Sequence, residues 1–255
     1  MKKAFILAAA LSIASSAYSA EGEVRCVAHR GYWKTEGSAQ NSIRALVKAD
    51  SIGCYASEFD VWLSADSEPV VNHDATFKGV HMQSAPADSC TAVVLDNGEN
   101  LPTLAEYLDT AEKLTGLRLV LELKAHDDRG QEREAVRQCV NMVIERGLQP
   151  RTDYITFSKN AMLDFIAMAP EGTRVYYLTG DMNPKELKEA GAAGLDYSLG
   201  TMRAHPEWFD QAHELGLEVN VWTVNDAGDM QWCIDKGADL ITTNEPELLH
   251  SLIGK

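Results

Sequence analysis

The feature of this 255-residue chain that most constrains its fold is a regular alternation of short β-type runs with helical stretches. Eight apolar runs have the length and composition of buried strands. They are Val24–Ala28, Ser57–Leu63, Leu117–Lys124, Tyr154–Ser158, Arg174–Leu178, Leu195–Leu199, Glu218–Val224 and Asp239–Thr242. No low-complexity tract, charge block or proline-rich linker separates them after the first twenty residues, so we expect one domain over residues 21–255.

Helical stretches lie between these strands, and several end at a glycine, as helices commonly do. They include Ser42–Ser51, Gln131–Arg146, Pro184–Ala190, Pro206–Leu215 and Ala227–Lys236. Eight strands alternating with helices predict an α/β fold, a single TIM-type (β/α)8 barrel. The main alternative is an open, doubly wound sheet. No Gly-x-Gly-x-x-Gly motif follows the first strand, which argues against a dinucleotide-binding fold.

One segment is additional to the eightfold repeat. A polar turn at Ala65–Glu68 leads from the second strand into a further short strand, Pro69–His73. Residues Ala75–Leu101 then show no convincing periodicity, so we expect a small insertion in loop form. Long loops in compact domains tend to be functional.

The first twenty residues have the layout of a secretory signal peptide. Lys2 and Lys3 precede an uncharged apolar run, and small residues follow, with Ala17, Ser19 and Ala20 near a plausible cleavage point. This run is too short to cross a bilayer, which takes about 20 residues, and no later run is longer. We therefore expect export, to the periplasm or the medium, and no stable insertion into a membrane.

The composition excludes several classes of partner. A formal charge of −15 argues against nucleic acid or an anionic membrane as a general partner. A phosphate site on so acidic a chain needs local cations, from side chains or from a metal. The five cysteines are too few and too irregularly spaced for a disulfide framework or a zinc motif.

Three carboxylates on two neighbouring strands stand out as metal-ligand candidates. Glu58 and Asp60 are two residues apart, so they face the same side of their strand, and Glu122 takes a similar place on the next strand. Three converging carboxylates would repel one another unless a cation lay between them. Ligands that are all oxygen favour Ca²⁺ or Mg²⁺. The alternative is that each acid is a solvated strand end.

Two histidines beside these carboxylates are candidate proton carriers. His29 closes the first strand and His73 the additional strand, and imidazole exchanges protons near neutral pH. Arg30 and Lys124 would supply the positive charge for a phosphate. Asp74 either orients His73 or belongs to a turn. The other histidines are interpreted as structural: His81, His126, His205, His213 and His250.

An ordered set of motifs resembles the glycerophosphodiester phosphodiesterase family. The set comprises Val27-Ala28-His29-Arg30-Gly31, Gln40-Asn41-Ser42, Glu58-Phe59-Asp60-Val61, Val70-Val71-Asn72-His73-Asp74, Leu101-Pro102-Thr103-Leu104, Leu121-Glu122-Leu123-Lys124, Val221-Trp222-Thr223-Val224-Asn225 and Gly237-Ala238-Asp239-Leu240-Ile241-Thr242-Thr243-Asn244-Glu245-Pro246. It covers nearly the whole chain after the first twenty residues. Two positions depart from the family's pattern: Gln40 and Asn244 stand where the family usually has acidic residues.

The resemblance implies a role for each candidate residue. Glu58, Asp60 and Glu122 would bind the divalent metal, His29 and His73 would form the acid–base pair, and Arg30 and Lys124 would contact the phosphate. Trp222 would form an apolar wall of the substrate site, unless it is a buried core aromatic.

The implied activity is hydrolysis of a small-molecule glycerophosphodiester to glycerol phosphate and an alcohol. Two alternatives stay open at this point. One is a related phospholipase-like or lyase enzyme that acts on lipid phosphodiesters. The other is an exported phosphodiester-binding protein without catalysis. The sequence contains no indication of an oligomeric state.

Overall fold

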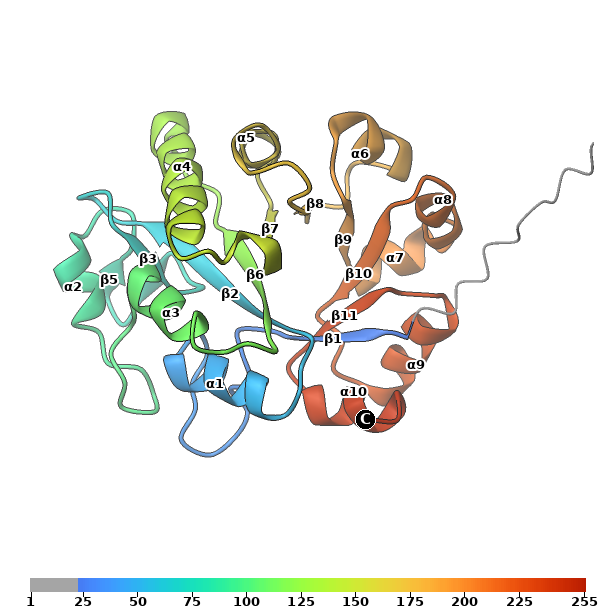
Figure 1. Ribbon diagram of the computed structural model, residues 1–255, viewed down its shortest axis with the longest axis horizontal. Coiled ribbons are helices and arrows are strands. Elements are labelled where there is room, and N and C mark those ends of the chain that lie inside the picture. Colours follow the sequence, from blue (N-terminus) through green and yellow to red (C-terminus); the bar gives the residue numbers. More distant parts are fainter. Residues whose placement is uncertain (1–22) are drawn as a thin grey trace, which may run out of the picture.

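The computed structural model describes residues 23–255, and the predicted signal peptide lies outside the described residues. Eight parallel strands close into a barrel, with helices around it (Figure 1). The strands of the ring are β1 (Arg25–Ala28), β2 (Ala56–Leu63), β6 (Arg118–Leu123), β7 (Thr152–Thr156), β8 (Val175–Tyr177), β9 (Gly194–Ser198), β10 (Glu218–Trp222) and β11 (Leu240–Thr243). The ring closes where β1 pairs with both β11 and β2. The predicted (β/α)8 barrel is therefore confirmed.

Helices follow the strands around the ring and cover their outer faces (Figure 1). They are α1 (Ile43–Ser51), α3 (Leu104–Ala111), α4 (Arg129–Glu145), α5 (Lys159–Met168), α6 (Pro184–Ala190), α7 (Leu199–Ala204), α8 (Trp208–Glu214), α9 (Ala227–Asp235) and α10 (Pro246–Leu252), with a short 3-10 turn at Gln149–Arg151. Within residues 23–255, none of the helices is both long enough and apolar enough to cross a membrane.

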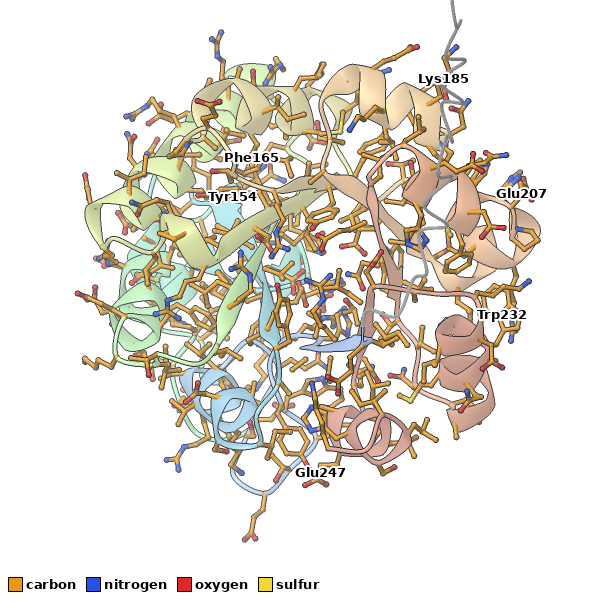
Figure 2. The ribbon with its side chains drawn as sticks, turned by 45° about the vertical axis from the view of Figure 1, so that its right-hand side comes forward. Tyr154, Phe165, Lys185, Glu207, Trp232 and Glu247 are labelled. Carbon is orange, nitrogen blue, oxygen red and sulfur yellow. The ribbon has the colours of Figure 1, made fainter. Side chains whose placement is uncertain are left out.

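Alternation along each strand divides the apolar side chains between two cores. On β1, Val27 faces the barrel interior, whereas Cys26 and Ala28 pack outward against the helices. The outer core includes the stacked rings of Tyr154 on β7 and Phe165 on α5, whose centroids are 4.4 Å apart (Figure 2). Because successive side chains of a strand point to opposite faces, the same strands contribute to the core inside the barrel and to the core between barrel and helices.

The insertion after β2 is more ordered than the sequence indicates. The strand β3 (Pro69–Val71) runs antiparallel to β2 and lies outside the ring. Residues Ala75–Leu101, expected to be a loop, contain a two-stranded hairpin, β4 (Thr76–Phe77) and β5 (Val80–His81), and a short helix, α2 (Ala87–Thr91). They have a small core of their own, here called the insertion core: Ala39, Trp62, Val70, Met82, Cys90, Val93, Leu95 and Leu101. The insertion after the additional strand is present, but the expectation that it is a loop was wrong, because elements of two to five residues are too short to show a period in the sequence.

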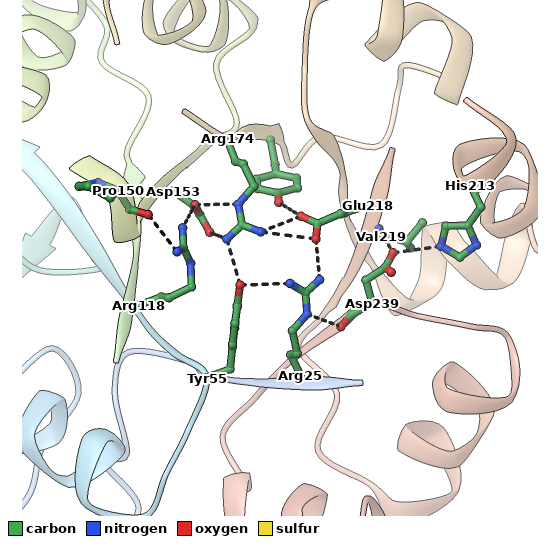
Figure 3. Close-up of polar contacts among 11 residues, drawn as sticks. Arg25, Tyr55, Arg118, Pro150, Asp153, Arg174, His213, Glu218, Val219 and Asp239 are labelled. Atoms are coloured by element: carbon green, nitrogen blue, oxygen red, sulfur yellow. Dashed lines mark hydrogen bonds and ion pairs between the residues drawn. The ribbon is translucent and has the colours of Figure 1, made fainter. Parts of the chain in front are cut away.

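A network of charged side chains closes the end of the barrel where the strands begin (Figure 3). Arg174 donates to Asp153 Oδ2 at 2.7 Å and to Glu218 Oε2 at 3.1 Å. Arg25 donates to Glu218 Oε1 at 2.6 Å, and the Tyr55 hydroxyl accepts from both arginines. Active sites in this fold lie at the opposite end of the barrel, where the strands finish. We therefore interpret this network as one that stabilises the barrel.

Candidate active site

The strand ends at the open mouth of the barrel bring the predicted site residues into one pocket. Its wall is formed by His29, Arg30, Glu58, His73, Glu122, Lys124, Ile155, Phe157, Leu178, Asp196, Trp222, Thr223 and Thr242. Seven of the eight predicted site residues are in this wall. The eighth, Asp60, lies directly behind it, in hydrogen-bond and ion-pair contact with its neighbours.

The three predicted metal ligands lie together. Carboxylate oxygens of Glu58, Asp60 and Glu122 come within 4.8 Å of one another, and all three residues are buried. Asp60 on β2 is the register partner of Glu122 on β6, which explains why the two side chains meet. The cluster sits inside the barrel and not at the last residue of β2, because that strand continues to Leu63.

The electrostatics of this cluster suit a bound cation. Burial, followed by the charges of Asp60 and Glu122, raises the pKa of Glu58 well above its usual value. Burial and Asp60 raise the pKa of Glu122 to about 8. Glu58 Oε1 is buried and has no hydrogen-bond donor among the described residues. A divalent cation would provide the missing partner and allow all three carboxylates to ionise, so the donor set fits a hard metal ion.

Lys124 already supplies one positive charge to the same cluster. It follows β6, and its ammonium nitrogen lies 2.8 Å from Asp60 Oδ1 and 2.7 Å from Glu122 Oε1. Burial opposes ionisation of Asp60, but the charges of Lys124, His73 and Arg30 outweigh it and lower the pKa of Asp60. The single positive charge of Lys124 is too small to neutralise three ionised carboxylates. A divalent metal ion would supply the additional positive charge.

Asn41 holds Asp60 in place, a contact that the sequence interpretation did not assign. The amide nitrogen of Asn41 donates to Asp60 Oδ2 at 2.8 Å, and its oxygen accepts from the Asp60 backbone N–H at 3.2 Å. Asn41 has a left-handed backbone, with φ of 59°. Asparagine tolerates this conformation better than most residues, and the motif Gln40-Asn41-Ser42 is the sequence signal that included it.

His29 directly follows β1, and its ring orientation is fixed by Asn244. The Asn244 side-chain oxygen accepts from His29 Nδ1 at 2.8 Å and from the Trp33 indole N–H at 3.1 Å. His29 Nε2 is therefore the unprotonated ring nitrogen, and it lies 4.0 Å from Glu58 Oε2. Burial, followed by the charge of Arg30, lowers the pKa of His29 to about 4, so its imidazole is neutral at pH 7.

His73 reaches the same pocket from outside the ring. The strand β3 ends at Val71, so His73 belongs to the following turn and does not close the strand. Its Nδ1 lies 2.7 Å from Asp74 Oδ1, which favours the orienting role for Asp74 over a purely structural turn. The His73 backbone carbonyl accepts from the Trp62 indole N–H at 3.2 Å. With 37% of its side chain exposed, His73 lies at the solvent-facing rim.

Arg30 lies beside the carboxylates, and its backbone takes part in the site as well. Its N–H donates to Glu58 Oε2 at 2.8 Å, and its Nε lies 3.7 Å from Asp60 Oδ2. Gln40 accepts a hydrogen bond from the Arg30 guanidinium. Gln40, which stands where the family usually has an acidic residue, therefore keeps the hydrogen bond with Arg30 but lacks the negative charge.

Trp222 lies across the pocket from the carboxylates. It ends β10, is partly exposed, and its indole N–H donates to the backbone carbonyl of Asp196 at 2.8 Å. Its ring packs edge-to-face with Phe157, with centroids 5.6 Å apart. Trp222 is thus a wall of the pocket, and its packing continues into the interior core.

The histidines interpreted as structural lie outside the pocket wall. His126 is buried; its Nε2 accepts from the Leu63 backbone N–H at 3.0 Å, which ties β2 to the end of β6. His213 lies 3.0 Å from Asp239 Oδ2, a partner 26 residues away that local spacing could not reveal (Figure 3).

The chain is similar to known phosphodiesterases along nearly its whole length. The model of the glycerophosphoryl diester phosphodiesterase family matches residues 29–248. A crystal structure of a glycerophosphodiester phosphodiesterase from Parabacteroides distasonis is 48% identical, with a TM-score of 0.90, over 91% of this chain and 98% of that chain. A glycerophosphodiester phosphodiesterase of Caldanaerobacter subterraneus subsp. tengcongensis is 25% identical over 258 residues, covering 90% of this chain and 97% of that protein.

A third relative shows the same fold with a product bound. It is a phosphodiesterase from Oleispira antarctica in complex with the product sn-glycerol-3-phosphate, 24% identical, with a TM-score of 0.78 over 91% of this chain and 97% of that chain. The family match covers every strand of the ring except β1, and it includes every residue of the pocket wall. The expected family is confirmed: the chain belongs to the glycerophosphoryl diester phosphodiesterase family and is an enzyme of that family.

Proposed function

We propose that this protein hydrolyses glycerophosphodiesters to glycerol phosphate and an alcohol, using a divalent cation and two histidines. The observation that carries the proposal is the meeting of two histidines, three carboxylates and two cationic side chains in one pocket, from four separate segments of the chain. The sn-glycerol-3-phosphate of the Oleispira antarctica complex is the product that this reaction would release.

The phosphate would lie against Arg30 and Lys124, where the acidic chain concentrates positive charge. Glu58, Asp60 and Glu122 would hold Ca²⁺ or Mg²⁺, which would supply a further positive charge to stabilise the negative charge that builds on the phosphate oxygens. Arginine and lysine provide the same stabilisation from the protein side. These cationic groups explain how a chain of net charge −15 can accept an anionic substrate.

Proton transfer would be divided between the two histidines. His29 Nε2 is unprotonated and would accept the proton of the attacking hydroxyl, while Asn244 holds its Nδ1–H. His73 would donate a proton to the departing alcohol oxygen as the phosphorus–oxygen bond breaks. Burial lowers the pKa of the free His73 side chain, but a bound phosphodiester brings a negative charge that favours its protonated form.

The attacking hydroxyl is either water or the neighbouring hydroxyl of the glycerol itself. The second route passes through a cyclic phosphate, which phosphorus NMR of the reaction mixture would detect. A related lipid-cleaving enzyme would instead need an apolar surface around the mouth of the pocket. Phe157 is the one exposed large apolar side chain among the described residues of the pocket wall, and so small an apolar surface favours a small, water-soluble diester.

Removal of the metal provides the test of the proposed site. Dialysis against a chelator of calcium and magnesium should abolish release of glycerol phosphate from a panel of glycerophosphodiesters, and returning one of the two ions should restore it. Glu122→Gln should lower activity to a similar extent, since it removes one charged ligand. The matched control is Glu189→Gln on the exposed face of α6, which should leave the rate unchanged. Full turnover by the metal-free enzyme would contradict the metal site.

We further propose that the protein acts in the periplasm or the medium, on the basis of residues 1–20. Expression of the full chain with a C-terminal tag, followed by cell fractionation, should recover the protein outside the cytoplasm. Edman sequencing of that fraction should show a new N-terminus close to Glu21. A tagged protein that stays in the cytoplasm with Met1 intact would contradict export.

A further inference from the structure

The pocket has two chemically different halves. His29, Glu58 and Lys124 represent the charged half, which is built on β1, β2 and β6. The half contributed by β7, β8 and β10 is apolar at Ile155, Phe157, Leu178 and Trp222. One further carboxyl lies among these apolar groups: Asp196, on β9. The order of strands in the ring separates β9 from β6 by β7 and β8, and from β1 by β10 and β11. Asp196 therefore lies across the barrel from the three-carboxylate cluster.

Asp196 is buried, yet one of its oxygens has no partner. It is the third residue of β9, and its side chain faces the interior because Leu195 and Tyr197 belong to the outer core. Only 2% of the residue is exposed, and Oδ1 has no hydrogen-bond donor among the described residues. Burying a carboxyl oxygen without a partner costs free energy. A group that brings a donor into the pocket would remove this cost.

The chemistry of the Asp196 carboxyl favours a hydroxyl group as that partner. Burial raises its pKa to about 7, so ionised and protonated forms are both present near neutral pH. A hydroxyl can donate to the ionised form and accept from the protonated form, whereas an ammonium group pairs only with the ionised form. The apolar side chains around Asp196 would pack against the carbon atoms that carry such a hydroxyl.

The position of His73 determines which end of the substrate reaches Asp196. If His73 donates its proton to the departing alcohol, that alcohol faces the rim, where 37% of the His73 side chain is exposed. The other ester group of the same phosphate leaves phosphorus in a different direction, away from the departing oxygen, and the pocket wall available to it includes the buried Asp196. In a glycerophosphodiester, this inner group is the glycerol, which carries two free hydroxyls.

We propose that Asp196 binds a hydroxyl of the glycerol group and thereby makes the enzyme select glycerol diesters over diesters of alcohols without a free hydroxyl. This inference rests on the proposed function, because it assumes that a phosphodiester occupies the pocket. It assigns Asp196 to substrate selection and not to proton transfer or metal binding. Sites built to hydrogen-bond a substrate hydroxyl discriminate strongly against analogues that lack it, because the protein group is then left unpaired.

The test compares two diesters that differ only in the inner group, glyceryl 4-nitrophenyl phosphate and propyl 4-nitrophenyl phosphate. The wild-type enzyme should show a higher kcat/KM for the glyceryl diester. Asp196→Leu should reduce the ratio of the two kcat/KM values by about 10- to 100-fold, the usual loss for an unpaired buried polar group. Asp196→Asn keeps a hydrogen-bond donor and an acceptor. Its ratio of the two kcat/KM values should therefore lie between those of the wild type and of Asp196→Leu.

Asp153→Asn is the matched control, since it makes the same chemical change at a buried carboxyl outside the pocket, in the network of Figure 3. It should lower the melting temperature and leave the ratio unchanged. Asp196→Leu should raise the melting temperature or leave it unaltered, because it removes a buried carboxyl of which one oxygen has no partner among the described residues. A purely structural role for Asp196 would instead lower the melting temperature and slow both diesters equally.

A binding measurement on the wild-type enzyme keeps the inference testable if the leucine variant does not fold. Calorimetry should show tighter binding of sn-glycerol 3-phosphate than of propyl phosphate. Equal binding of the two, together with equal turnover of the two diesters, would overturn the role of Asp196 while leaving the phosphodiesterase activity in place. Failure of the wild-type enzyme to cleave either diester would count against the proposed function itself.

Discussion

At the residue scale, the site depends on pairs of side chains in which one group fixes the other. Asn244 orients His29, and Asp74 orients His73. Each pair places a ring nitrogen toward the pocket by engaging the opposite nitrogen, which is how histidines are held in one tautomer. The two proposed proton carriers therefore differ in setting: His29 is largely buried, and His73 is at the rim.

This difference leads to a test of the two proposed roles. His29→Ala and His73→Ala should each slow a natural glycerophosphodiester by about 10²- to 10⁴-fold, the usual contribution of a positioned proton carrier. A nitrophenolate leaves without needing a proton. On a nitrophenyl diester, His73→Ala should therefore regain much of its lost rate, whereas His29→Ala should remain slow. Rescue of His29→Ala instead would reverse the assignment, and rescue of neither would remove His73 from proton transfer.

The side chains that carry the chemistry were the part of the site most open to prediction. Glu58 and Asp60 could be assigned to one face because strand side chains alternate with a period of two. Asn41 and Asp196 were not assigned a role, since their importance comes from contacts with residues 19 positions away and from a pocket built by distant strands. No local pattern encodes such contacts.

At the element scale, the turn after β1 sets how closely the first helix approaches the site. Arg30 and Gly31 both have positive φ, and the Gly31 N–H donates to the Glu58 backbone carbonyl at 3.1 Å. A β-carbon on Gly31 would lie 2.7 Å from atoms of Ala45 on α1. The helix can pack against this turn only because the residue has no side chain.

Gly31→Ala should therefore destabilise the fold more than an equivalent change elsewhere. Gly37 is the matched control, since it also has a positive φ, of 70°, but a β-carbon there would meet nothing within 4 Å. Both variants should lose about 1–2 kcal/mol for the left-handed backbone, and Gly31→Ala should lose roughly 1–3 kcal/mol more for overpacking. Urea unfolding of the two variants measures the difference. Equal free energies of unfolding would show that α1 shifts without cost.

The elements of the barrel were predictable to within a few residues, and those of the insertion were not. The strands of the ring are separated by helices of up to 17 residues with clear start and stop signals. In the insertion, β4 and β5 have two residues each, and their pairing follows from packing on the insertion core. Two residues contain no period, so tertiary contacts determine this part of the structure.

At the scale of the whole molecule, one ion pair makes stability depend on pH near neutrality. His213 on α8 lies against Asp239, which precedes β11 and also accepts from the Val219 backbone N–H at 2.7 Å (Figure 3). The hydrogen bond to Asp239 raises the pKa of His213, while burial opposes the shift and Asp210 adds to it. The folded state therefore binds a proton at His213 more tightly than the unfolded chain does.

The sign of the resulting pH dependence follows from this raised pKa. The stabilisation is fully present below the unfolded pKa, about 6.5, and is lost as the pH rises through the folded pKa. The free energy of unfolding of the wild type, minus that of His213→Gln, should therefore decrease between about pH 6 and pH 8. Urea titrations of both proteins across this range measure the difference. A difference that stays constant or increases with pH would contradict the assignment.

The insertion core and the barrel cores are separate apolar clusters, yet each supports one of the two histidines in the pocket. His29 belongs to the ring, whereas His73 depends on β3 and on the insertion core that packs around Trp62 and Val70. Turnover that uses both histidines then requires the two packing units to stay docked. Detachment of the smaller unit on heating would therefore abolish activity while circular dichroism still recorded an intact barrel.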